Sequence, residues 1–124
     1  MLASVVLVAL GGAVGAPLRY VTDLVVQSAH DTVFPWGTFV VNVVGSLVLG
    51  CAAGAVSGGA PEWMLTLLGT GVCGALTTFS TFGFETVRLV EEGALLEATL
   101  NAVAGLLVAL VACMGGFALV AAVT

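Results

Sequence analysis

A polar cluster near the middle of the chain carries most of the side chains that could bind an ion. Residues 74–85 read GALTTFSTFGFE, a run in which hydroxyl groups alternate with phenylalanines before a glutamate closes it. Glycines in and just before this run weaken a helix, so the composition predicts an interrupted helix whose freed carbonyls coordinate a ligand. Phe79 and Phe82 are three residues apart and therefore share one helical face.

Two interpretations of this phenylalanine pair are open. A phenyl ring has a negative face and a positive edge, so two rings presented edge-on would line a path for an anion without any full positive charge. As core side chains, the two residues would need no further explanation. The neighbouring hydroxyls of Ser80 and Thr81, in a chain with only two Lys or Arg residues, make the anion path competitive with core packing.

Two asparagines lie within apolar runs. Asn42 is in the middle of VVNVVGS, and Asn101 is in the last apolar run of the chain. An amide in hydrocarbon requires a polar partner, so each side chain should face the interior of a helix bundle or a water-filled cavity. An interhelical hydrogen bond and a cavity lining explain the two asparagines equally well.

The composition assigns the chain to a lipid bilayer. Of its 124 residues, 60% are hydrophobic and 7% are charged, whereas a soluble domain carries about a quarter charged residues. The uncharged runs are long enough for membrane spans of about 20 residues each. They predict an all-α integral membrane protein, a single domain over 1–124, with four transmembrane helices at roughly 2–26, 34–57, 62–88 and 95–123.

Charge and cysteine content exclude other classes. The net charge of −5 argues against nucleic-acid binding and against a polybasic lipid anchor. The three cysteines lie in apolar runs, at spacings that fit neither a disulfide framework nor a zinc site. No nucleophile or acid–base pair lies within a span, so we expect no enzyme.

The distribution of arginines and glycines bears on assembly. With four spans, Arg19 and Arg88 fall on the same side of the membrane, a bias weak enough for insertion in either orientation. Gly11–Gly15 and Gly50–Gly54 have GxxxG spacing, which lets helix backbones approach closely. Several faces of small residues therefore favour dimerisation.

The ordered motifs resemble those of the Fluc (CrcB) family of small membrane fluoride channels. The resemblance is carried by GGAVGAPLRY at 11–20, FPWGTFVVNVVGSLVLG at 34–50 and GALTTFSTFGFE at 74–85. It covers the first three predicted helices, and the fourth matches in hydrophobicity and position alone.

The resemblance implies a specific architecture and site. Family members form antiparallel, dual-topology dimers in which the interrupted third helices cross. By similarity, the carbonyls of Gly74 and Thr77 bind a central structural Na⁺, with no organic cofactor, and Arg19 lies near a vestibule. The residues that match the fluoride pore of the family are Asn42, Phe79, Ser80, Thr81 and Phe82.

One departure from the family concerns the fourth helix. Relatives often carry a tyrosine and serines there, whereas this chain offers Asn101, Gly105 and Ala109. Either Asn101 substitutes for the missing side chains or the pore of this subunit is incomplete. A paralogous partner subunit, as in heterodimeric fluoride channels, therefore remains an alternative to the homodimer.

The resemblance implies a passive channel in the plasma or inner membrane of a prokaryote. It would export F⁻ from the cytoplasm and protect the cell against fluoride toxicity. One alternative is a small four-helix, proton-coupled multidrug exporter, but such a protein needs a carboxylate inside the membrane, and Glu85 lies at a predicted helix boundary. A second alternative, a non-transporting assembly subunit, leaves the hydroxyl–phenylalanine cluster unexplained.

Overall fold

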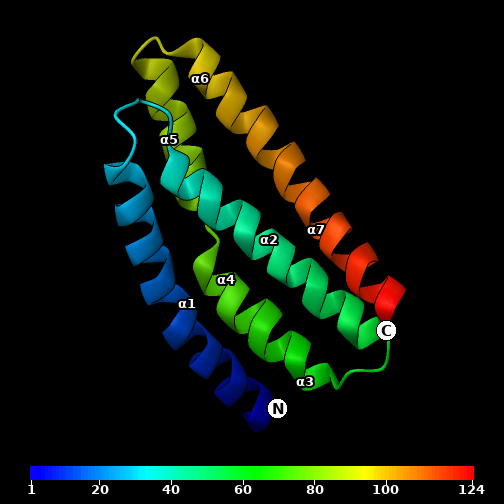
Figure 1. The fold of residues 1–124 in the computed structure, drawn as a ribbon. Helices are drawn as coiled ribbons and strands as arrows, with labels where there is room; N and C mark the ends of the chain where they lie inside the picture. The colour runs from blue at the N-terminus through cyan, green and yellow to red at the C-terminus, as the bar shows by residue number, and fades with distance from the viewer.

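Four helical rods form the molecule, and the computed structural model describes all residues from Met1 to Thr124 (Figure 1). The first two rods are α1 (Leu2–Ser28) and α2 (Trp36–Ser57). The third comprises α3 (Glu62–Met64), η1 (Leu65–Cys73), α4 (Gly74–Leu76) and α5 (Ser80–Glu91), and the fourth comprises α6 (Leu95–Thr99), η2 (Leu100–Ala104) and α7 (Gly105–Val123). All four are long and apolar enough to cross a membrane. The chain is therefore an all-helical, multi-pass membrane protein, as predicted.

The ends of the rods differ by a few residues from the expected ranges, for local reasons. The last turn of α1 extends to Ser28, whose hydroxyl donates to the Val25 carbonyl at 2.9 Å. Helix α2 begins only at Trp36 because Pro35 occupies the cap position with a non-helical ψ of 71°. Helix α5 continues to Glu91, and Gly93, with a φ of 78°, then reverses the chain in a conformation that suits glycine.

Close packing inside the chain uses the GxxxG pairs. Helix α2 lies along α7, and α1 lies along η1 (Figure 1). A Cβ on Gly11 would lie 2.7 Å from the Cα of Gly71, and one on Gly54 would lie 2.6 Å from the Phe117 carbonyl oxygen. Both glycine pairs are thus occupied by neighbours in the same chain. The inference that these faces favour dimerisation is not supported, because they have no free surface for a second copy.

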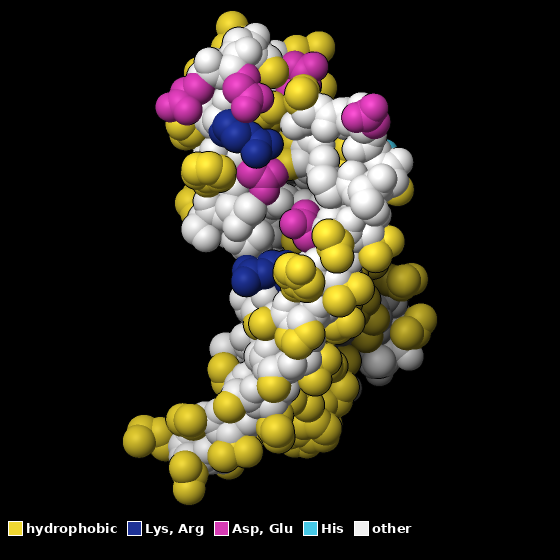
Figure 2. Space-filling model, turned by 90° about the vertical axis from the view of Figure 1, so that its left-hand side faces the viewer, with side chains coloured by type: hydrophobic (Ala, Val, Ile, Leu, Met, Phe, Trp, Pro, Cys, Tyr) yellow, Lys and Arg dark blue, Asp and Glu magenta, His cyan; other side chains and the backbone are white.

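Charged side chains gather at one end of the bundle, opposite the two chain termini (Figures 1 and 2). This end contains the end of α1, the α1–α2 connection, α5 and α6, which together hold Arg19, Arg88 and most of the carboxylates. The lower part of the molecule in Figure 2 shows no charged side chain, and many hydrophobic side chains cover it. The separation matches a molecule whose apolar length lies in lipid and whose charged end approaches water.

Candidate functional site

A central cavity of about 310 Å³ is bounded by α2, the third rod, η2 and the beginning of α7. Its wall contains no charged residue, and its polar side chains are amides and hydroxyls. Five of the residues proposed from the sequence line this one cavity: Asn42, Gly74, Thr77, Phe79 and Phe82. The Thr77 hydroxyl gives its one hydrogen to the Cys73 carbonyl at 2.8 Å, so the Asn42 amide and the other hydroxyls are the donors that could replace the water shell of a small anion.

A second cavity, of about 200 Å³, lies nearer the charged end. Arg19 and Thr81 line it, together with Asp23 and Thr38. Arg19 takes part in no ion pair, since the single salt bridge of the chain joins Arg88 to Glu92 at 3.8 Å. Thr78 lines both cavities and is the residue that they share.

Ser80 is the one proposed pore residue that lines neither cavity. It is exposed, and its Oγ lies 3.4 Å from the Oγ1 of Thr78. The same Thr78 oxygen accepts a hydrogen bond from the Thr81 backbone N–H at 3.2 Å. The Thr78 hydroxyl thus satisfies one backbone N–H in the first turn of α5, as a capping side chain does.

Asn42 is joined to the third rod by a pair of hydrogen bonds. Its Nδ2 donates to the Thr78 carbonyl at 3.0 Å, and its Oδ1 accepts from the Thr78 backbone N–H at 2.8 Å. The backbone N–H can only donate and the carbonyl can only accept, so the orientation of the amide is fixed. The side chain therefore makes an interhelical bond and lines the cavity at once, with its second Nδ2 hydrogen still free.

The backbone changes course between α4 and α5. Thr77 has φ −78° and ψ 159°, an extended conformation, and helical geometry resumes at Ser80. In a continuous helix, the Thr78 N–H would donate to the Gly74 carbonyl, but here it donates to Asn42. No backbone or side-chain donor reaches the carbonyl of Gly74 or of Thr77. The Ala75 carbonyl lacks a donor as well, so at least three acceptors are left free midway along a membrane span.

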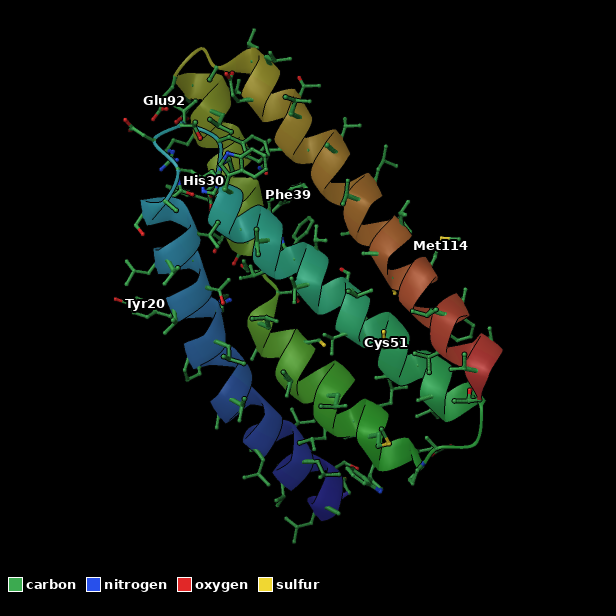
Figure 3. The ribbon with its side chains drawn as sticks, in the orientation of Figure 1. Tyr20, His30, Phe39, Cys51, Glu92 and Met114 are labelled. Atoms are coloured by element: carbon green, nitrogen blue, oxygen red, sulfur yellow. The ribbon has the colours of Figure 1, made fainter.

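The two phenylalanines of the cluster lie together on the cavity wall. Their ring centroids are 5.8 Å apart, with an angle of 38° between the ring planes. Phe82 is half-buried, whereas the Phe79 side chain is 83% exposed in the single subunit. A third ring, that of Phe39, also lines the cavity from α2 (Figure 3).

Two polar contacts were not foreseen from the sequence. Thr38, which is 2% exposed, donates to a Glu85 carboxylate oxygen at 2.6 Å, and these residues are 47 positions apart. Asn101, which is 1% exposed, donates to the Thr86 hydroxyl at 2.8 Å. A hydroxyl at the start of an apolar run was the available signal for Thr38, but nothing in the sequence indicated its partner.

Comparison with known proteins places the chain in a family. Residues 6–117 match the model of the family described as CrcB-like protein, Camphor Resistance (CrcB). A protein of Frankia casuarinae named Fluoride-specific ion channel FluC 1 is 55% identical over 123 residues, covering 94% of this chain and 95% of the relative. A protein of the same name in Streptomyces avermitilis is 58% identical over 111 residues, covering 89% and 90%.

A more distant relative, from Shewanella amazonensis, carries the name Fluoride-specific ion channel FluC. It is 45% identical over 109 residues, covering 86% of this chain and 87% of the relative. The match thus extends through all four rods and across the cavity wall. The chain belongs to the CrcB-like family, whose curated relatives here are named fluoride-specific ion channels.

Proposed function

We propose that this protein is a passive, fluoride-selective channel that exports F⁻ from the cytoplasm. The observation that carries the proposal is the central cavity, whose wall combines an asparagine N–H, threonine hydroxyls and phenyl rings with no charged residue. The names of the relatives agree with this chemistry. A channel of this kind would lower internal fluoride after HF enters a cell and dissociates.

The proposed path begins at Arg19 in the second cavity. Its unpaired guanidinium attracts an anion, and the Thr81 hydroxyl replaces part of the water that the ion leaves behind. At the central cavity, the free N–H of Asn42 is a donor for fluoride. The edges of Phe79 and Phe82 carry partial positive charge, so they stabilise the anion without holding it too strongly to leave.

The proposed pore needs a second subunit. An unsatisfied backbone carbonyl in hydrocarbon costs several kcal/mol, so the free carbonyls of Gly74 and Thr77 must be covered. Gly74 and Phe79 are both exposed in the single subunit and lie beside these carbonyls. A second copy of the chain, inserted antiparallel, would cover them where the two interrupted third helices cross. The presence of only two arginines supports dual topology, and a paralogous subunit is the alternative partner.

A structural Na⁺ fits the same place. No cluster of His, Cys, Asp or Glu side chains gathers anywhere in the chain to hold a metal, so a cation would depend on backbone oxygens. The free carbonyls of Gly74 and Thr77 are hard donors of the type that Na⁺ prefers. With both subunits contributing, four carbonyl oxygens would coordinate the Na⁺ at the centre of the dimer, and its positive charge would offset their partial negative charges.

Fluoride efflux from liposomes tests the function. Purified protein reconstituted in vesicles loaded with KF should release F⁻ when valinomycin carries K⁺, without any proton gradient. Chloride-loaded vesicles are the selectivity control. Proton-coupled uptake of a cationic drug would favour the exporter instead, and the absence of any flux from a folded dimer would favour an assembly subunit or a missing paralogous partner.

A further inference from the structure

The fourth rod meets α5 through two contacts that lie one helical turn apart. Asn101 donates from Nδ2 to the Thr86 hydroxyl at 2.8 Å. Four residues along, a Cβ added to Gly105 would lie 3.4 Å from Cε2 of the Phe82 ring. Because Phe82 and Thr86 are also four residues apart, the two helices pair antiparallel, with Phe82 against Gly105 and Thr86 against Asn101.

The hydrogen bonds at this contact run in one direction. The Thr86 hydroxyl donates its single hydrogen to the Phe82 carbonyl at 2.8 Å, and a carbonyl can only accept. The hydroxyl must therefore accept from Asn101, which fixes the orientation of that amide. Asn101 is 1% exposed, and this is the one hydrogen bond that its side chain makes within the chain. Breaking it would leave a buried donor without a partner.

This contact is the last polar link before the two rods separate. Helix α5 packs against α6 and η2, but it has little contact with α7 beyond Gly105. The segment η2 is π-helical, and such segments often occur at functional sites. Asn101, Gly105 and Ala109, spaced four residues apart on one face of the fourth rod, all line the central cavity. The Phe82 ring lines the same cavity.

We propose that Asn101 is a positioning residue for the Phe82 ring and acts through Thr86. By fixing the separation of α5 and the fourth rod, it holds the ring edge against Gly105 and on the cavity wall. The effect on ion flux rests on the channel function proposed above, whereas the effect on the ring does not. The proposal also gives a role to a residue that replaces the aromatic and hydroxyl side chains expected in this helix.

Two isosteric variants, with one rescue, test the proposal. Asn101→Leu removes the amide, and Thr86→Val removes the hydroxyl at a residue that lines neither cavity. Each should reduce fluoride efflux per folded dimer by about fivefold, the equivalent of one hydrogen bond of about 1 kcal/mol. The double variant should be no worse than the more severe single variant, because both break the same link. Thr86→Ser, which keeps the hydroxyl, should restore flux.

A readout independent of conduction follows the ring itself. With 4-fluorophenylalanine in place of Phe82, the ¹⁹F spectrum in fluoride-free micelles should shift or broaden in both isosteric variants. The same label in place of Phe39, which lines the cavity from α2, should be unaffected.

The outcomes separate the alternatives. Loss of flux in Asn101→Leu alone would make Asn101 a direct ligand of the ion and overturn the positioning role. Lower thermal stability with unchanged flux and an unchanged ¹⁹F spectrum would mean that the contact contributes only to packing. This result would also overturn the positioning role. A wild-type dimer without fluoride flux, in which the Phe82 label still shifts in both variants, would refute the channel and support the positioning role.

Discussion

The conformation of the chain between α4 and α5 should depend on Asn42. Asn42→Leu keeps a similar side-chain volume but removes both hydrogen bonds to the Thr78 backbone. At about 1 kcal/mol each, the two bonds contribute about 2 kcal/mol, which is about thirtyfold in the equilibrium between the ordered and the opened segment. The Thr78 amide hydrogen should therefore exchange with deuterium about thirtyfold faster in the variant than in the wild type.

Fluoride flux should also change in Asn42→Leu. Two further variants at this position separate the effect of losing the amide from the effect of adding a charge. Asn42→Ser removes the long amide without adding charge. Asn42→Asp retains an acceptor for the Thr78 N–H but sets a carboxylate oxygen against the Thr78 carbonyl and in the path of an anion. We expect fluoride efflux to fall in the order wild type, Asn42→Ser, Asn42→Asp.

The control for both measurements is Val44→Ala, at an exposed position of α2 outside the cavity walls. Its exchange rate at Thr78 and its fluoride efflux should match the wild type. Wild-type amide exchange and wild-type flux in the folded Asn42→Leu dimer would refute the reasoning. The two hydrogen bonds would then not stabilise the conformation between α4 and α5.

Three further outcomes are expected. Phe82→Ile keeps much of the volume but removes the ring edge, so the folded dimer should conduct little fluoride. Wild-type efflux in this variant would mean that the ring contributes only to packing. A Cβ on Gly74 would meet only the Gly69 carbonyl oxygen, at 3.9 Å, so Gly74→Val should fold but lose the dimer on gel filtration, whereas Thr77→Ser should keep it. Asp31→Cys, in the exposed α1–α2 connection, should react with an impermeant maleimide from both sides of the membrane; labelling from one side only would indicate a paralogous partner.

The four spans could be predicted because their signal is compositional. A run of uncharged residues long enough to cross a bilayer as a helix can be recognised without any knowledge of contacts. Some of the residues that line the central cavity could be predicted for a similar reason. Asn42 and the hydroxyl–phenylalanine cluster are polar or special residues within apolar runs, and lipid leaves such residues few places to go other than the bundle interior.

Contacts that depend on helical phase could not be predicted. Two segments, η1 and η2, are π-helical, and each widened turn rotates the residues after it relative to an ideal α-helix. The partner of Asn101 therefore stayed open, although the three residues singled out in this helix, Asn101, Gly105 and Ala109, all line the central cavity. The position of Ser80 outside both cavities was not foreseen either, because the extended backbone at Thr77 resets the helical phase before α5, and the Ser80 hydroxyl lies next to that of Thr78.

The backbone between α4 and α5 supports a second subunit more strongly than the glycines do. GxxxG spacing identifies helix faces that pack closely, but it cannot distinguish a partner in the same chain from one in another copy. Here Gly11 and Gly54 both face neighbours within the chain. The stronger argument is the pair of free carbonyls at Gly74 and Thr77, since hydrocarbon does not tolerate unsatisfied backbone acceptors. The surface around these carbonyls therefore needs to be covered in the membrane. We expect the molecule that covers this surface also to complete the cavity wall beside Phe79.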